Sequence, residues 1–178
     1  MRYRSAETRQ TEKGAAADMA GSKGADALRL DRQICFAIYK AQHAFTSVYR
    51  PLLSELGLTY PQYLVMIALW EHGDRTVKDL GTALELDSGT LSPLLKRLEA
   101  IGFIKRARST GDERVVVISL TQQGSDLSKK AADVPPKILN AGQLPMNDYK
   151  ELHRLLGDLT SALHEHGSEP TPPTREHA

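Results

Sequence analysis

Residues 86–124 read LDSGTLSPLLKRLEAIGFIKRARSTGDERVVVISLTQQG, and this stretch decides the fold. In its first half, leucines recur every three or four residues up to Gly102, as in an amphipathic helix that ends at a glycine. Two apolar runs follow, separated by the charged segment RSTGDER, in which STGD has the composition of a turn. The pattern predicts a helix over 88–101 and a hairpin of two strands, 103–108 and 113–120.

Three more helices are predicted upstream of this stretch. Apolar residues spaced by three and four predict a long helix from about Arg29 to Leu56. A second helix opens at TYPQ, where Thr59 and Gln62 have the spacing of a capping box. Thr76 begins the segment TVKDLGTAL, which predicts a short third helix.

Two further helices are predicted downstream. Thr121 caps a fifth helix that Pro135 and Pro136 interrupt, and a sixth spans about Asp148 to His164 with leucines on one face. The order is therefore four helices, two strands and two helices. Because two short helices, a longer helix and a charged hairpin make a winged helix-turn-helix, the predicted fold class is mainly α with a small β-hairpin wing.

Length and composition predict one folded domain with two tails. A chain of 178 residues can bury a substantial core. Residues 1–27 are rich in Ala, Gly, Ser and mixed charge, and residues 167–178 hold three of the nine prolines. Both segments offer little apolar surface to offset the entropy of ordering, so we predict disordered tails on either side of a domain over 28–166.

Overall charge favours no class of partner. Lys and Arg number 23 against 22 Asp and Glu, which gives a net charge of +1. No apolar run approaches the roughly 18 residues of a membrane span, and the N-terminus lacks the apolar segment of a secretory signal. The single cysteine excludes an intrachain disulfide and a cysteine-based zinc site within one chain. We therefore expect a cytoplasmic protein without metal or cofactor. His164 and His166 are two residues apart, so on a helix they would point to nearly opposite sides, which indicates surface residues.

The predicted helix over 88–101 has a polar face suited to DNA. Its leucines fall in one sector of the helical wheel. Ser88, Thr90 and Ser92 leave the first turns small and polar, which suits contact with base edges or the sugar-phosphate backbone, whereas Lys96 and Arg97 suit phosphates. The alternative, considering this helix alone, is an ordinary amphipathic surface helix.

The hairpin adds a local concentration of positive charge. Between Lys96 and Arg114 there are six cations against three acids in a chain whose total is +1. Phosphate binding rewards such clustering through counterion release. We predict that Arg108, Asp112 and Arg114 belong to a DNA-binding wing, that Arg114 enters the minor groove, and that Asp112 holds it. The alternative is a solvated hairpin at the edge of a sheet.

The segment quoted above resembles the recognition helix and wing of the MarR family of dimeric winged-helix repressors. DER at 112–114 matches the wing motif of that family, and LTQQG at 120–124 matches the LT..G that follows it. The resemblance covers about residues 29–166 and implies double-stranded operator DNA and a second copy of the chain as partners. The apolar stripes of the first and last helices predict that these helices form the dimer interface.

The lone Cys35 lies within the predicted first helix, four residues before Tyr39 and on the same face. Tyr49 is fourteen residues from Cys35 and close to the same stripe, but about 21 Å away along one helix. An antiparallel helix from a second subunit would bring its Tyr49 near Cys35, where phenolic hydroxyls would favour the thiolate that attacks a peroxide. The alternative is an inert, buried cysteine.

Residues 31–70 resemble the organic hydroperoxide-sensing branch of the MarR family, which has a reactive cysteine and two tyrosines at the positions of Cys35, Tyr39 and Tyr49. This resemblance implies that an organic hydroperoxide oxidises the cysteine and that the repressor then leaves DNA. Some members trap the sulfenic acid with a second cysteine, which this chain lacks. A small thiol, a backbone nitrogen or further oxidation must take its place.

Together these features predict a peroxide-responsive homodimeric repressor that binds a pseudo-palindromic operator and has no catalytic residues. Two alternatives stay open. One is a MarR-type regulator gated by a bound phenolic ligand, in which Cys35 is idle. The other is a thiol peroxidase, for which the cationic hairpin would have no use.

Overall fold

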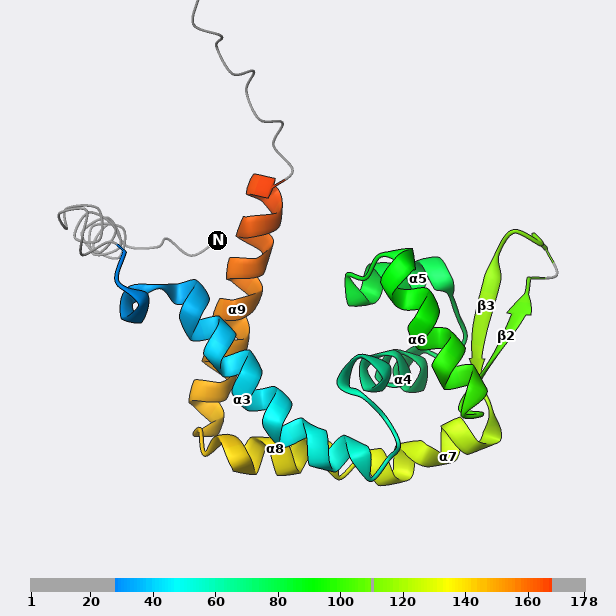
Figure 1. The fold of residues 1–178 in the computed structure, drawn as a ribbon, viewed down its shortest axis with the longest axis horizontal. Coiled ribbons are helices and arrows are strands. Elements are labelled where there is room, and N and C mark those ends of the chain that lie inside the picture. The colour runs from blue at the N-terminus through cyan, green and yellow to red at the C-terminus, as the bar shows by residue number, and fades with distance from the viewer. Residues whose placement is uncertain (1–27, 110, 168–178) are drawn as a thin grey trace, which may run out of the picture. The chain divides into compact units, whose positions relative to one another are not determined.

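The computed structural model describes residues 28–109 and 111–167, and this part of the chain is mainly helical (Figure 1). It divides into two compact units, with the boundary between Ser128 and Lys129. The predicted tails lie outside the described residues, except for Gly167 at the end of the last helix. The predicted limits of the 28–166 domain stay a prediction.

The first helix, α3, spans Ile34–Ser54 and follows a short 3-10 turn, η1, at Leu30–Arg32. It begins later than predicted because Gln33 has an extended backbone, with φ −80° and ψ 117°. Pro51 lies inside the helix, in its last turn. Cys35 and Tyr49 therefore occupy one continuous helix, as the spacing of apolar residues predicted.

The second helix, α4, spans Tyr60–His72 and is the centre of the first unit. The predicted capping box is confirmed: Gln62 Oε1 accepts hydrogen bonds from the Thr59 backbone N–H at 2.8 Å and from its hydroxyl at 3.0 Å. Six side chains along α4 are buried, namely Gln62, Tyr63, Val65, Met66, Ala68 and Leu69. A helix buried to this extent serves as the support for the elements that pack around it.

Two helices form the helix-turn-helix: α5 at Val77–Leu84 and α6 at Ser88–Ala100. Thr76 caps α5 as predicted, since its hydroxyl accepts from the Asp79 N–H and the Asp79 carboxylate accepts from the Thr76 N–H. Burial of the inner face of α6 anchors it, with Leu91, Leu95 and Leu98 at most 1 % exposed.

The wing is a hairpin of β2 at Ile104–Arg108 and β3 at Val116–Leu120. A third strand, β1 at Arg75–Thr76, pairs antiparallel with β3 and gives the sheet order β1-β3-β2. The sequence did not predict β1. The two longer strands extend beyond α6 as a narrow projection (Figure 1). The fold class is thus mainly α with a small sheet, as predicted, but the sheet has three strands.

The LT..G motif packs the start of α7, Gln122–Ala131, against the base of the wing. The Thr121 hydroxyl donates to the Gly102 carbonyl at 2.6 Å and accepts from the Gly124 N–H at 3.0 Å. Gly124 lies so close to the Phe103 carbonyl that a Cβ would overlap it. The motif therefore encodes a close backbone approach that only glycine permits.

The second unit contains α8 at Val134–Gly142 and α9 at Met146–Gly167. The predicted interruption by Pro135 and Pro136 is wrong in detail, because the prolines lie in the first turn of α8, where their missing N–H groups cost nothing. The break between α7 and α8 precedes them. Among the described residues, no helix has the length and hydropathy to cross a membrane.

Candidate functional site

The outer face of α6 presents the predicted polar residues. Ser88, Thr90, Lys96 and Arg97 are exposed, and Ser92 is half-buried. The leucines on the opposite side fix the helix to the core, so these side chains are held at the surface in a defined order along one helix. This is the arrangement expected of a helix that lies in a major groove.

Asp87 caps the N-terminus of α6. Its carboxylate accepts from the Thr90 N–H at 3.0 Å and from the Thr90 hydroxyl at 2.7 Å. These hydrogen bonds, that of the hydroxyl first, lower the pKa of Asp87 below its ordinary value. Thr90 therefore takes part in the cap, in addition to its predicted role toward DNA.

The cap predicts a specific dependence of stability on pH. Because the pKa of Asp87 is lowered in the folded state, its contribution is present above the unfolded pKa and is lost as pH falls through the folded value. Asp87→Ala is expected to lower the Tm by a few degrees at neutral pH. Asp87→Asn keeps a capping oxygen and should lose only the pH dependence; thermal unfolding between pH 3 and 7 would measure both. Equal pH profiles for the wild type and Asp87→Asn would contradict this role.

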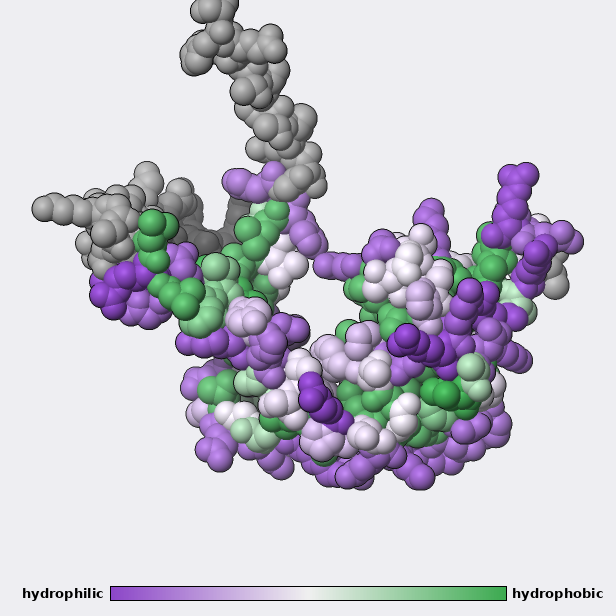
Figure 2. All heavy atoms as spheres, in the orientation of Figure 1, coloured by the Kyte–Doolittle hydropathy of each residue, from purple (hydrophilic) through white to green (hydrophobic). Residues whose placement is uncertain are grey.

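The tip of the wing is organised by Asp112. Its carboxylate accepts from the Arg114 backbone N–H at 2.9 Å, and its carbonyl accepts from the Val115 N–H at 2.9 Å. Asp112 thus holds the backbone of Arg114, whose side chain is exposed. The Ser109 N–H closes the turn on the Val115 carbonyl at 2.8 Å. Hydrophilic side chains gather at this end of the molecule (Figure 2).

A hollow of about 620 Å³ lies between the wing and the helix-turn-helix, and Ser92, Arg106 and Arg114 line it together. Lys78 of α5 also lines it, although the sequence gave no reason to select this residue. Arg106 Nε lies 3.7 Å from Glu99 Oε2, which is an ion pair but too long for a hydrogen bond. The structure therefore brings three cations and a serine from α5, α6 and the wing to one surface. Arg108 is exposed near the tip of the same wing.

Cys35 is an exposed free cysteine in the first turn of α3, so the alternative of a cysteine buried within its own chain is wrong. Phe36 and Tyr39 flank it, with ring centroids 6.3 Å apart, and Tyr39 contacts the His43 ring at 4.4 Å. Tyr39 is 56 % exposed.

Within the described residues, no group of His, Cys, Asp or Glu could hold a metal ion.

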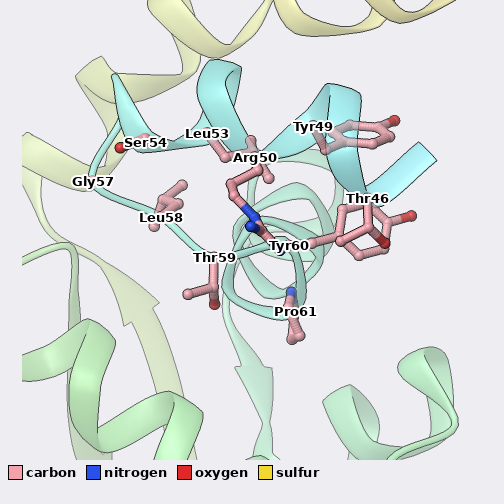
Figure 3. A pocket seen from close by; sticks show the side chains of 10 residues that line it. All are labelled: Thr46, Tyr49, Arg50, Leu53, Ser54, Gly57, Leu58, Thr59, Tyr60 and Pro61. Carbon is pink, nitrogen blue, oxygen red and sulfur yellow. The ribbon is translucent and has the colours of Figure 1, made fainter. Parts of the chain in front are cut away.

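Tyr49 lies further along α3, in a cluster of tyrosines that no local sequence pattern had indicated. Its ring centroid is 4.8 Å from that of Tyr60 and 6.2 Å from that of Tyr63, both on α4. Tyr49 and Tyr60 line a pocket of about 480 Å³ between α3 and α4, with Arg50 near its middle (Figure 3). The TYPQ sequence had marked this turn as a cap but gave no sign that its tyrosine meets Tyr49.

Helices α3 and α9 each expose an apolar face. On α3 this face comprises Ile34, Ile38, Phe45 and Val48, which are 36–66 % exposed. On α9 it comprises Met146, Tyr149, Leu152, Leu155, Leu156 and Leu163, which are 37–62 % exposed. Exposed apolar faces of this kind are typical of interaction surfaces.

Comparison with known proteins gives related regulators of transcription. The family model described as "Transcriptional regulator SarA/Rot" matches residues 47–131. The organic hydroperoxide resistance transcriptional regulator of Bacillus subtilis is 47 % identical over 140 residues, which are 79 % of this chain and 95 % of that protein. The regulator TtmR of Methylorubrum extorquens is 46 % identical over 139 residues, which are 78 % of this chain and 71 % of that protein.

A solved structure gives the same result for the fold. Reduced AbfR bound to DNA, from Staphylococcus epidermidis, matches with a TM-score of 0.67 and 35 % identity over 79 % of this chain and 96 % of that chain. The matching family model and the relatives from Bacillus subtilis and Methylorubrum extorquens are transcriptional regulators, so the chain regulates transcription and is not an enzyme. The alternative of a thiol peroxidase is therefore wrong. The chain belongs to the MarR family of winged-helix transcriptional regulators, in the organic hydroperoxide-sensing branch and of its one-cysteine type.

Proposed function

We propose that this regulator binds operator DNA as a homodimer and is released when an organic hydroperoxide oxidises Cys35. The observation that carries the proposal is the placement of the only cysteine: Cys35 is exposed at the start of α3, and the same α3 carries Tyr49. Fourteen residues of continuous helix separate the two by about 21 Å. Because Tyr49 of the same chain cannot reach Cys35, Tyr49 of the second subunit is the one that would act on it.

The exposed apolar faces of α3 and α9 support the homodimer. Their side chains are large, aliphatic or aromatic, and arranged along whole helices. Such faces are suited to a two-fold interface in which each subunit buries the same residues. An antiparallel pairing of two α3 helices would bring Cys35 of one subunit toward Tyr49 of the other. Tyr39, four residues from Cys35, would complete the site.

The surface of α6 and the wing supports DNA as the partner. Ser88, Thr90 and Ser92 would contact bases or the sugar-phosphate backbone, and Lys96 and Arg97 would contact phosphates. Arg114 would enter the minor groove beside Arg108, with Asp112 fixing the turn. AbfR, which shares the fold, has been solved on DNA in its reduced form. A dimer would present two such surfaces to the two halves of a pseudo-palindromic operator.

The chemistry of release begins with the Cys35 thiolate. The sulfur attacks the outer peroxide oxygen, the O–O bond breaks, and the peroxide leaves as an alcohol after taking up a proton. The sulfur, oxidised by two electrons, becomes a sulfenic acid. A small cellular thiol then attacks the sulfenic sulfur, which forms a mixed disulfide and releases water. The capped cysteine no longer fits the interface, and the wings leave DNA.

The test compares wild type and Cys35→Ser on operator DNA, with and without tert-butyl hydroperoxide and a small thiol. We expect peroxide to weaken wild-type binding by at least about tenfold, which a coupling of about 1.4 kcal/mol would produce, and to leave Cys35→Ser unaffected. Intact mass should show the capped cysteine in the wild type alone. Equal release of both proteins would contradict redox control through Cys35.

The second candidate function is gating by a small phenolic ligand, with Cys35 idle. The pocket beside Tyr49 supports it, because about 480 Å³ is enough for a small aromatic acid that Arg50 would hold by charge (Figure 3). Cys35→Ser separates the two functions, since a ligand-gated regulator would keep its full response in this variant.

A further inference from the structure

A chain of contacts runs through the first unit from Tyr49 to the base of the wing. The Tyr49 ring lies 6.2 Å from the ring of Tyr63, which is 3 % exposed. The Tyr63 ring in turn lies 6.2 Å from that of Trp70, in an edge-to-face arrangement. Both distances fall in the range of about 4.5–7 Å at which aromatic rings attract each other.

The chain continues through hydrogen bonds into the wing. Trp70 Nε1 donates to the Gly124 carbonyl at 2.9 Å, across 54 residues of sequence. The Gly124 N–H donates to the Thr121 hydroxyl, which donates to the carbonyl of Gly102 at 2.6 Å. Gly102 lies between the end of α6 and the start of β2. The contacts that begin at Tyr49 therefore end where the recognition helix turns into the wing.

Helix α4 can transmit a displacement from one ring to the next because its side chains are tightly packed. Tyr63 and Trp70 are seven residues apart, so two turns of α4 place them on one face. The neighbouring Val65, Met66 and Leu69 are at most 1 % exposed, which leaves the helix little room to absorb a displacement of one ring. A shift of Tyr49 would be passed to Trp70 instead of being dissipated.

We propose that Tyr49, Tyr63 and Trp70 form a relay that couples the state of Cys35 to the orientation of the wing. Trp70 is the positioning residue, because its indole N–H ties α4 to the backbone of α7 beside the wing. The relay rests on the proposed function, in which Tyr49 meets the cysteine of the second subunit. Oxidation that displaces Tyr49 would then move the wing base through packed rings and one hydrogen bond.

The wild-type protein carries its own probe, since Trp70 is its single tryptophan. Tryptophan emission depends on the polarity and hydrogen bonding around the indole. We expect tert-butyl hydroperoxide with free cysteine to shift the emission of the full-length wild type as the capped cysteine forms, and to leave that of Cys35→Ser unchanged. If wild-type DNA affinity falls while the emission stays constant, the relay is wrong and the proposed function stands.

Variants test the coupling directly. Trp70→Phe removes the indole donor, and Tyr63→Leu removes the ring between Tyr49 and Trp70. In each, Cys35 should oxidise at the wild-type rate, while the ratio of the Kd for DNA in the oxidised state to that in the reduced state should fall by about fivefold. This is the effect expected of losing one net hydrogen bond in Trp70→Phe or one aromatic pair in Tyr63→Leu. Tyr63→Phe keeps the ring and should keep the full ratio.

Val65→Ala controls for stability, because it deletes buried atoms from the same helix outside the ring series. It should lower the Tm and keep the wild-type ratio of affinities. If Val65→Ala reduced the ratio of oxidised to reduced Kd as much as Trp70→Phe does, the relay would be overturned, since loss of stability alone would then explain the effect. If peroxide fails to weaken DNA binding by the wild type, the proposed function fails and the relay fails with it.

Discussion

Gly124→Ala is expected to lower the free energy of unfolding by about 3 kcal/mol or to prevent folding. The new Cβ would overlap the Phe103 carbonyl oxygen and lie 2.9 Å from its carbon. That carbonyl cannot simply turn away, because it accepts a hydrogen bond from the Thr121 N–H at 3.0 Å and lies 3.2 Å from the Thr121 hydroxyl. Relief of the clash would break the contact between α7 and the wing.

Urea unfolding at one fixed protein concentration measures this effect, since the stability of a dimer depends on concentration. The matched control is Gly142→Ala, at the end of α8, where a Cβ would meet nothing within 4 Å. This control should gain stability, by up to about 1 kcal/mol, because alanine favours the helix. Wild-type stability in Gly124→Ala would mean that the close approach does not exist.

Arg114→Ala is expected to weaken binding to operator DNA by about 100-fold. An arginine that reads DNA contributes about 1–3 kcal/mol. A loss of about 1.4 kcal/mol in each subunit is tenfold, and a dimer would lose two such arginines. The backbone of Arg114 is fixed by Asp112, so the loss should come from the side chain and not from a disordered turn. Asp112→Ala, which frees the turn and keeps the cation, should weaken binding less.

The measurement is a titration of labelled operator over a range of salt concentrations. A cation placed in the minor groove also displaces condensed counterions, so the slope of log K against log salt should become shallower by about two in Arg114→Ala, one for each half-site. The matched control is Lys137→Ala, which removes an exposed cation from α8 and should leave affinity and slope unchanged. Equal losses in Lys137→Ala and Arg114→Ala would show that net charge, and not the wing, supports binding.

The short-range features of the fold could be predicted from the sequence. The predicted caps at Thr59 and Thr76 both form. Each pairs with a residue three positions later, Gln62 or Asp79, and helix geometry alone brings residues at this spacing together. The leucines of α6 and the charged hairpin likewise follow from local periodicity and turn composition. The candidate residues of α6 and the wing therefore lie on the surfaces where they were expected.

Features that join distant segments could not be predicted in this way. Strand β1 is two residues long and exists because β3 supplies its hydrogen-bond partners. Lys78 and Arg106 reach one hollow only after the wing folds back on α5.

The sequence by itself determined the order of the main helices and of the two wing strands, the polar face of α6 and the charge of the wing. It also determined that Cys35 and Tyr49 lie on one helix, too far apart to touch within one chain. Only the tertiary structure decided that Tyr49 meets Tyr60 and Tyr63, and that Trp70 bonds to a backbone carbonyl 54 residues away. The physical reason is that helical spacing and caps are fixed by residues within a few positions of each other. Ring contacts and close backbone approaches depend instead on how whole elements pack, and no local pattern records that packing.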